Sequence, residues 1–343
     1  MKPAELKKRL AAEATRLDRV MRDDLTTAIK ADSTLAAVLD HALFAGGKRI
    51  RPLLTILAAQ LTGSADNPEA LPPAQLDRLA IAFEYLHAAS LLHDDVIDHA
   101  RLRRGRETVN TRWANEHAIL AGDFLHARAM LLAGTAGGIH SLELIGIATQ
   151  AMVESEFIQM EAAARADDQE ETYFKVLAGK TAALIAAACE CGVVAAGGTP
   201  AQRQALHTYG ANLGLAFQII DDLLDYQGEP TATGKAVGND LQEGKMSLPM
   251  IYALERAAPA QRDWLREILT ISPAERLGHL AAVTLKMAES GVFTACRNRA
   301  EELIKTGFAG LTGCLPPAAP AQKAAEALAL LGALGRYVLT RKR

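Results

Sequence analysis

The chain has 343 residues, half of them hydrophobic, and a formal net charge of −3 at pH 7. This length suits one large domain or two ordinary ones. The near balance of charge excludes a strongly basic face for nucleic acid and an acidic tail. The first nine residues are too charged to hold the apolar core of a signal peptide.

The helices predicted in chain order leave no long linker. Aromatic residues are few, and alanine and leucine dominate, which favours helix throughout. We expect helices at 3–30, 34–45 (capped by Ser33 or Asp32), 52–62, 75–99, 112–134, 140–165, 170–196 and 201–226, shorter helices within 247–310, and a last helix after 320. Loops are expected at 63–75, 101–108 and 228–245. The fold predicted is a single all-α domain over residues 1–343, a bundle of about ten or more helices around a deep central cavity.

The cysteines and the longest apolar run bear on location. The run from Thr181 to Gly198 is short for a membrane span, so it predicts a buried core helix and no transmembrane segment. Cysteines occur in one Cys-x-Cys pair and two single positions, without the second half of a zinc site. Reduced, buried thiols in a cytoplasmic protein are therefore expected at Cys189, Cys191, Cys296 and Cys314.

Two copies of the pattern Asp-Asp-x-x-Asp carry the functional argument. Each follows an apolar run, so each is expected at the mouth of a core rather than on a solvated stripe. On a helix the first and last acids of a copy share one face. Clustered carboxylates repel, and a core cannot hold them unpaired, so a cation must lie between them. Hard oxygen ligands suit Mg²⁺. The predicted metal ligands are Asp94, Asp95, Asp98, Asp221, Asp222 and Asp225.

Cationic residues gather in loops near these motifs. One group surrounds a glycine turn, one follows the first motif, and three lysines lie beside Gly or Thr: these are Lys48, Arg49 and Arg51; Arg101, Arg103, Arg104 and Arg106; and Lys180, Lys235 and Lys245. Carboxylates that bind Mg²⁺ beside cations that need anions indicate a diphosphate ligand. Arg49, Arg101 and Arg106 are interpreted as solvated loop charges.

At these residues the sequence resembles the trans-isoprenyl diphosphate synthases of the polyprenyl synthetase family. The resemblance covers nearly the whole chain. It is carried by the Gly-Lys-Arg-x-Arg-Pro loop, the His-containing first acidic motif with its arginine pair, and further motifs in the family's order. They occupy residues 47–52, 87–105, 121–123, 159, 180–181, 217–222, 234–235, 238–241 and 243–245.

The resemblance implies an isoprenoid-synthase fold, a homodimer, and head-to-tail condensation of an allylic diphosphate with isopentenyl diphosphate. About three Mg²⁺ would be held by the six aspartates, and Asp240 would support the second cluster through a water. By position, Arg103, Lys180 and Lys235 would contact the allylic diphosphate, and Lys48, Arg51, His87 and Arg104 the isopentenyl diphosphate; Lys245 joins the substrate-binding set. Thr181 and Gln218 would lie near the carbocation. The catalytic set is Asp94, Asp98, Lys180, Thr181, Gln218 and Asp221.

In this family, side chains just before the first acidic motif limit the length of the product. Here Ala89 and Ser90 are small, with Leu86 one turn deeper and the aromatics Tyr85 and Phe83 nearby. This predicts a product longer than fifteen carbons, a medium or long polyprenyl for a quinone tail. A geranylgeranyl or farnesyl diphosphate synthase is the alternative, in which these residues are small only for helix packing.

Other classes fit parts of the pattern. His93-Asp94 would suit an HD-type phosphohydrolase, although a His at a helix end is more often simply hydrogen-bonded. Glu84-x-x-His87 loosely resembles a ferritin-like di-iron site. A terpene cyclase shares the first motif but usually lacks the second. A non-catalytic regulatory subunit typically has degraded motifs, and both copies here are intact.

Overall fold

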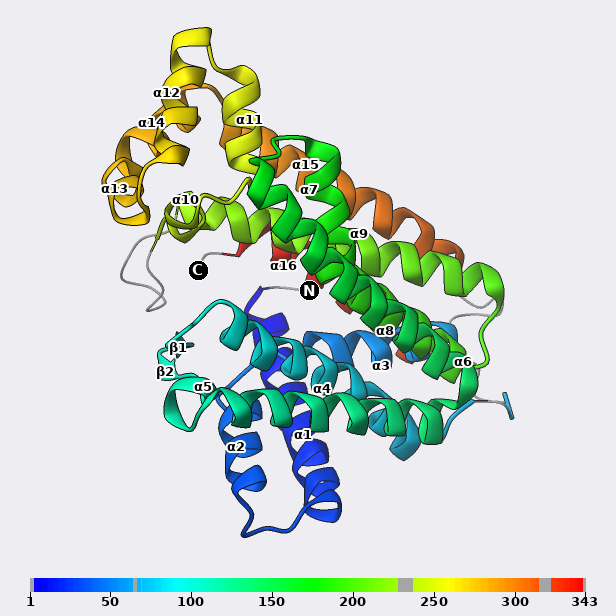
Figure 1. Ribbon diagram of the computed structural model, residues 1–343. Helices are drawn as coiled ribbons and strands as arrows, with labels where there is room; N and C mark the ends of the chain where they lie inside the picture. Colours follow the sequence, from blue (N-terminus) through cyan, green and yellow to red (C-terminus); the bar gives the residue numbers. More distant parts are fainter. Residues whose placement is uncertain (1–2, 64–66, 69, 228–236, 315–321, 342–343) are drawn as a thin grey trace. The chain divides into compact units, whose positions relative to one another are not determined.

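The computed structural model describes residues 3–63, 67–68, 70–227, 237–314 and 322–341, and nearly all of them are helical (Figure 1). The all-α fold class is confirmed. The elements are α1 (Pro3–Ala28), α2 (Thr34–Leu43), α3 (Ile50–Thr62), α4 (Pro73–Ile97), β1 (Leu102–Arg103), β2 (Arg106–Glu107), α5 (Val109–Arg112), α6 (Asn115–Arg165), α7 (Glu170–Leu177), the π-helix η1 (Ala178–Ala182), α8 (Ala183–Ala195), α9 (Pro200–Gln227), α10 (Asn239–Glu243), α11 (Leu248–Arg256), α12 (Pro259–Thr270), α13 (Pro273–Gly278), α14 (Leu280–Glu289), α15 (Val292–Ala309), the 3₁₀-helix η2 (Gly310–Cys314) and α16 (Gln322–Thr340).

The chain forms two compact units. The first contains Met1–Thr149, Leu184–Gly210 and Gly310–Leu334, and the second contains Gln150–Ala183, Ala211–Ala309 and Gly335–Arg343. The first acidic motif lies in the first unit and the second motif in the second unit. One domain over residues 1–343 stays a prediction.

Helix α4 is the core helix of the first unit. It packs against α1, α2, α3 and α5, and every residue from Leu79 to Leu86 is buried. A helix buried on all sides must be hydrophobic all round, as this segment nearly is. The hydroxyl of Tyr85 donates to the carbonyl of Met21 (3.2 Å) and to Asp24 (3.1 Å), which also accepts a two-pronged ion pair from Arg128. These contacts fix α4 against α1, and with it the acidic motif at its end.

Most predicted helix ends agree with the structure. Ser33 caps α2, since its hydroxyl accepts the backbone N–H of Ala36 at 3.1 Å. The helices predicted at 112–134 and 140–165 are the two arms of α6, which breaks at Gly138 with φ of 73°. The predicted loop 228–245 is wrong in part, because α10 forms within it between two left-handed glycines, Gly238 and Gly244.

Among the residues that the structure describes, two helical stretches are long and apolar enough to cross a membrane by length and composition alone: Asn115–Arg165 and Glu170–Ala195. The apolar window of the second is 72% buried within the structure, as expected of a core helix. Nearly every residue of α8 is buried, which confirms the buried core helix predicted for that run. The predicted buried thiols are also confirmed, because all four cysteines are free and buried.

Candidate active site

The first acidic motif lies at the carboxyl end of α4. Asp95 is buried, Asp94 is partly exposed, and Asp98 is exposed at the helix cap. Positions four apart share a helix face, so Leu86, Ser90, Asp94 and Asp98 form one stripe along α4. Asp95 lies on a different face. The motif therefore presents its carboxylates in two directions.

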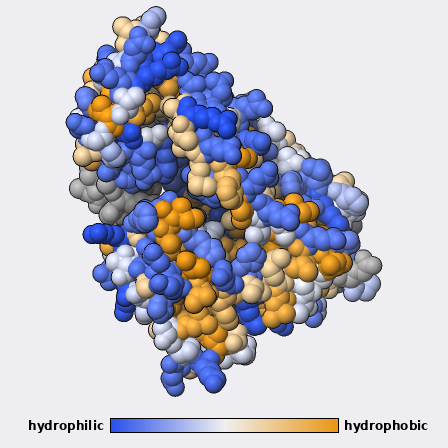
Figure 2. Space-filling view, viewed as in Figure 1, coloured by the Kyte–Doolittle hydropathy of each residue, from blue (hydrophilic) through white to orange (hydrophobic). Residues whose placement is uncertain are grey.

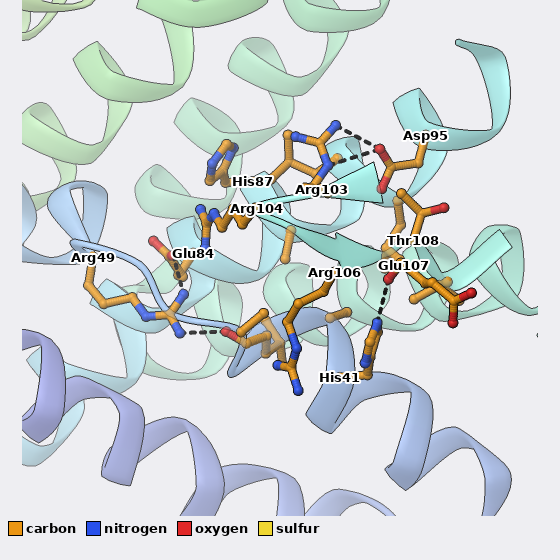
Figure 3. Close-up of a pocket in the computed structure, with 17 residues that line it drawn as sticks. His41, Arg49, Glu84, His87, Asp95, Arg103, Arg104, Arg106, Glu107 and Thr108 are labelled. Carbon is orange, nitrogen blue, oxygen red and sulfur yellow. Dashed lines mark hydrogen bonds and ion pairs between the residues drawn. The ribbon is translucent and has the colours of Figure 1, made fainter. Parts of the chain in front are cut away.

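Asp95 pairs with an arginine of the β1–β2 hairpin. The Nε and Nη2 atoms of Arg103 lie 2.9 and 2.8 Å from one carboxylate oxygen of Asp95 (Figure 3). Arg103 is paired with Arg106 across the hairpin, which leaves Arg104 and Gly105 as a two-residue turn with φ of 53° and 74°. Such a turn needs positive φ at both positions. Glycine adopts positive φ freely, whereas Arg104 is strained by roughly 1 kcal/mol. The backbone of the turn therefore holds Arg103 and Arg104 in place.

A pocket lies between the end of α2, one face of α4 and this hairpin (Figure 3). The α4 face is built from residues three and four apart, which lie in line on a helix. Arg103 and Arg104 reach the pocket from the hairpin, beside His87 of α4. The lining residues from α4 are Glu84, His87, Ala88, Leu91, Leu92 and Asp95.

Positive charge is in excess in this pocket, which we call the cation pocket. Burial lowers the pKa of His87 well below its usual value, and the nearby charges of Arg51 and Arg104 lower it further. The imidazole is therefore neutral at pH 7. Burial also lowers the pKa of Arg51 to about 10, against a smaller opposing effect of Glu84. The Nε atom of Arg51 is buried and has no hydrogen-bond partner within the described residues. This environment favours an anion.

The interpretation of Arg49 as a solvated loop charge is wrong. Arg49 is buried, and its guanidinium contacts Glu84 (2.7 Å), Asp18 (2.7 Å) and the carbonyl of Leu43 (2.5 Å). Its backbone is left-handed, with φ of 47°. Arg49 therefore anchors the glycine turn to α1 and α4. Arg101 and Arg106 are exposed, as predicted.

The second acidic motif lies on α9, within the second unit. Asp222 is buried and accepts hydrogen bonds from Tyr173 and Gln218, each 2.8 Å long. Asp225 is also buried and accepts the backbone N–H of Asp240 at 2.8 Å. Neutral donors thus contact the two buried acids.

Asp221 is the exposed member of this motif. Its side chain is 46% exposed and lies 2.8 Å from Nη2 of Arg341, beyond the end of α16. The same guanidinium lies 4.0 Å over the ring of Phe217. A basic residue near the carboxyl end of the chain therefore already contacts the first acid.

Lys180 and Thr181 lie on a π-helical turn that the sequence did not reveal. Helix η1 interrupts the predicted helix 170–196 for one turn, and such turns are frequent at functional sites. Nζ of Lys180 lies 2.7 Å from Glu156 and 3.2 Å from the amide oxygen of Gln159. The hydroxyl of Thr181 lies 3.4 Å from the amide oxygen of Gln218.

A second pocket in this unit, the acid pocket, brings several predicted residues together. Burial raises the pKa of Asp222 to about 7; hydrogen bonds from Gln218 and Tyr173 oppose the shift, and the charge of Asp221 adds to it. Burial and the charges of Asp222 and Asp225 raise the pKa of Asp240 well above its usual value. The pocket is therefore short of positive charge. Its polar lining residues include Gln159, Tyr173, Lys180, Gln218, Asp222, Asp240 and Lys245.

These donors fit a divalent cation. Carboxylate oxygens are the ligands that Mg²⁺ prefers, and buried acids with raised pKa values would be stabilised by one. Within the described residues no three His, Cys, Asp or Glu side chains already converge on one point. Bridging oxygens from a bound diphosphate would have to complete the coordination.

The lysines that were predicted in loops lie in different surroundings. Lys48 is exposed on the turn before α3. Lys245 lines the acid pocket, is exposed, and lies 2.5 Å from Glu243. Lys235 lies outside the described residues.

Tyr173 is a functional candidate that the sequence reasoning missed. It lines the acid pocket and contacts Asp222. It precedes Lys180 by seven residues, two turns on the same helix face, and that spacing was the available signal.

The hydrogen-bonded interpretation of His93 is confirmed. Its Nε2 lies 3.2 Å from the carbonyl of Ile119 and 3.5 Å from Asp123. A Cβ added at Gly122 would lie 2.3 Å from that nitrogen. The motif 121–123 therefore uses its glycine to admit the imidazole.

The fold and the two pockets define an all-α enzyme for diphosphate substrates. The sequence model of the polyprenyl synthetase family matches residues 32–285, so the chain belongs to this family. The octaprenyl diphosphate synthase of Escherichia coli K12 is 38% identical over 266 residues, covering 78% of this chain and 80% of that protein. A short-chain isoprenyl diphosphate synthase of Methanothermobacter thermautotrophicus is 39% identical over 240 residues, covering 69% and 72%.

A solved structure supports the same assignment. The polyprenyl synthase of Caulobacter crescentus, complexed with calcium and isoprenyl diphosphate, has a TM-score of 0.83 and 33% identity, with 98% of this chain and 97% of that chain covered. The chain is thus a prenyltransferase. The phosphohydrolase, di-iron and non-catalytic alternatives do not apply.

Proposed function

We propose that the enzyme condenses an allylic diphosphate with isopentenyl diphosphate, head to tail, to give a trans-polyprenyl diphosphate. The observation that carries the proposal is the opposite charge of the two pockets, each beside one Asp-Asp-x-x-Asp motif. The cation pocket, with His87, Arg103 and Arg104, suits a diphosphate. The acid pocket, with Asp222 and Asp240, suits Mg²⁺.

The six motif aspartates would hold Mg²⁺, with three ions in an active site. Bound Mg²⁺ neutralises the charge that develops on a departing diphosphate. In the second motif Asp222 and Asp225 would be the buried ligands, and Asp221 the accessible one. In the first unit Asp94 and Asp98 lie on the same stripe of α4, which is exposed at the carboxyl end of the helix.

Lys180 and Gln218 of the acid pocket, with Thr181 beside Gln218, suit the allylic half of the reaction. The ammonium of Lys180 supplies a point charge for the allylic diphosphate. The oxygens of Thr181 and Gln218 can stabilise an allylic cation by their dipoles without attacking it. We propose that the released diphosphate is the base that accepts the proton lost in the last step of the condensation.

We further propose a product longer than fifteen carbons, a quinone side-chain precursor. Ser90 and Leu86 continue the stripe of Asp94 down α4, and Ala89 is small and buried beside them. Tyr85 is directed to α1 by its hydrogen bonds, and no aromatic residue occupies the stripe at positions 86 and 90. The octaprenyl relative supports this length; the short-chain relative, of nearly equal identity, shows that overall identity does not decide it.

The test is incubation with labelled isopentenyl diphosphate, Mg²⁺ and each allylic primer in turn, with product length read by chromatography. Wild-type enzyme should extend farnesyl diphosphate by several units. Ala89→Phe should shorten the product because a ring on α4 blocks the growing tail. Tyr337→Phe, an isosteric change on α16, is the control. Unchanged product length in Ala89→Phe contradicts the role of this stripe.

We propose a cytoplasmic homodimer. Helix α6 exposes large apolar side chains, Leu131, Ile139 and Ile147 in the first unit and Val153, Phe157 and Met160 in the second (Figure 2 shows such hydrophobic patches on one face). Surfaces of this kind are typical of protein interfaces. Sedimentation equilibrium should give twice the chain mass of 36.6 kDa, and a monomer contradicts the proposal.

A further inference from the structure

Tyr173 makes a buried contact with the second acidic motif. The side chain lies on α7 and is 7% exposed. Its hydroxyl donates to Oδ2 of Asp222 at 2.8 Å. The other carboxylate oxygen, Oδ1, accepts from the amide of Gln218 at 2.8 Å. The carboxylate of Asp222 is therefore held at both oxygens, by donors from two different helices.

This arrangement leaves Asp222 able to bind a cation. Each carboxylate oxygen has two lone-pair directions, and each donor occupies one of them. Neither donor carries a charge, whereas the partner of Asp95 is the guanidinium of Arg103; the charge of Lys245 favours the ionised form of Asp222, but less than burial opposes it. A hydroxyl donor can therefore orient the carboxylate and still leave lone pairs with which the carboxylate can bind a metal ion.

Helix α7 is itself firmly held, so the Tyr173 hydroxyl has a defined position. Tyr252 of α11 donates to Glu170 at 3.2 Å, and Arg299 of α15 lies 3.8 Å from the same carboxylate. Thr172 donates to Asp167 at 3.0 Å. Precise ligand orientation by such supporting groups typically changes metal affinity by 10- to 100-fold.

We propose that Tyr173 is a positioning residue for the prenyl transfer: its hydroxyl fixes the carboxylate of Asp222 so that the second acidic motif binds divalent cation with diphosphate. The inference rests on the proposed function, because it takes Asp222 as a metal ligand. In this role Tyr173 would act through Asp222 and would not be a metal ligand itself.

The experiment compares Tyr173→Phe with a matched control. Tyr209→Phe also removes a buried hydroxyl, one that donates to the carbonyl of Leu331 at 2.8 Å in the first unit. Binding of Mn²⁺ in the presence of inorganic diphosphate is followed by the loss of the free-ion signal in electron paramagnetic resonance. Tyr173→Phe should weaken Mn²⁺ binding about tenfold, whereas Tyr209→Phe should lower thermal stability similarly and leave Mn²⁺ affinity within about twofold of wild type.

A double variant separates a direct effect from a structural one. If Tyr173 acts through Asp222, the Tyr173→Phe effect on Mn²⁺ affinity should vanish in an Asp222→Asn background. Equal Mn²⁺ affinity in wild type and Tyr173→Phe, or an undiminished effect in the Asp222→Asn background, overturns the inference. The Mn²⁺ titration needs no turnover, so failure of wild-type enzyme to elongate any primer would count against the proposed function and leave this result readable.

Discussion

The two pockets hold the same acidic motif in opposite electrostatic surroundings. In the cation pocket the pKa of His87 and that of Arg104 are lowered, chiefly by burial, so positive charge is disfavoured there. In the acid pocket the pKa of Asp222 and of Asp240 is raised, so negative charge is disfavoured. Each pocket lacks the ion that the other carries in excess. Diphosphate would supply the anion that the first pocket lacks, and Mg²⁺ the cation that the second pocket lacks.

The counter-charges of the two motifs also differ. Asp95 is neutralised by Arg103, which the hairpin presents through the strained turn at Arg104. Asp222 instead accepts hydrogen bonds from the neutral donors Tyr173 and Gln218. A carboxylate with neutral donors gains more from an added cation than one that is already paired. The comparison indicates that the acid pocket depends on metal more strongly than the cation pocket does.

Loss of either motif is the most severe test, since both should be essential. Asp94→Ala and Asp221→Ala should each lower kcat on the order of 10³-fold, because each removes charge that would hold the cation at the leaving group. Asp263→Ala, an exposed acid of α12, is the control. Initial rates at saturating substrate check this. Full activity in either variant would show that one motif is dispensable.

Replacing Arg103 tests whether its two nitrogen donors matter to the first motif beyond its positive charge. Arg103→Lys keeps the charge but cannot offer two parallel donors to Asp95. We expect kcat/KM for the allylic substrate to fall about tenfold. The neighbouring exposed Arg101→Lys should leave it unchanged. If both variants behave alike, the fork has no special role.

The features that the sequence predicted correctly are those with local signals. Apolar periodicity placed α4 and α9, each of which carries one of the Asp-Asp-x-x-Asp motifs. The burial of Arg49 was not predictable, because it depends on Asp18 and Glu84, which are distant in sequence and meet only in the folded unit. Asp221 and Arg341 are 120 residues apart in the sequence, so no local sequence pattern could predict their pairing.

The π-helical turn at Lys180 escaped detection for a related reason. Its composition is that of an ordinary helix, and the widened turn reflects close packing. A Cβ at Gly179 would lie 2.5 Å from the carbonyl of Ala151. Such a contact depends on tertiary packing that periodicity cannot report.

Because the pKa of His87 is lowered in the folded state, the stability of the protein should depend on pH. Its folded-state pKa lies below the unfolded value of about 6.5, so folding favours the neutral form. The stability that this contributes is complete above about pH 6.5 and is lost as the pH falls below it. The melting temperature of wild type should therefore drop more steeply between pH 7 and 5 than that of His87→Asn, by roughly 2 °C per pH unit. Parallel curves in differential scanning fluorimetry would contradict a lowered pKa of His87 in the folded state.

The smallest expected effect concerns the contact between Arg341 and the second motif. Arg341 is held over Phe217 and contacts Asp221, so it should compete with Mg²⁺ for that carboxylate. Because the side chain of Asp221 is half exposed, the contact is worth less than about 1 kcal/mol. Arg341→Gln should lower the half-saturating Mg²⁺ concentration by about threefold, measured from initial rates at saturating substrates. Arg336→Gln, at an exposed position of α16, should not change it. A higher Mg²⁺ requirement in Arg341→Gln would instead indicate that the arginine helps to bind the metal–diphosphate complex. The second motif would then rely on an arginine, as the first motif does, and the contrast between the two would be smaller.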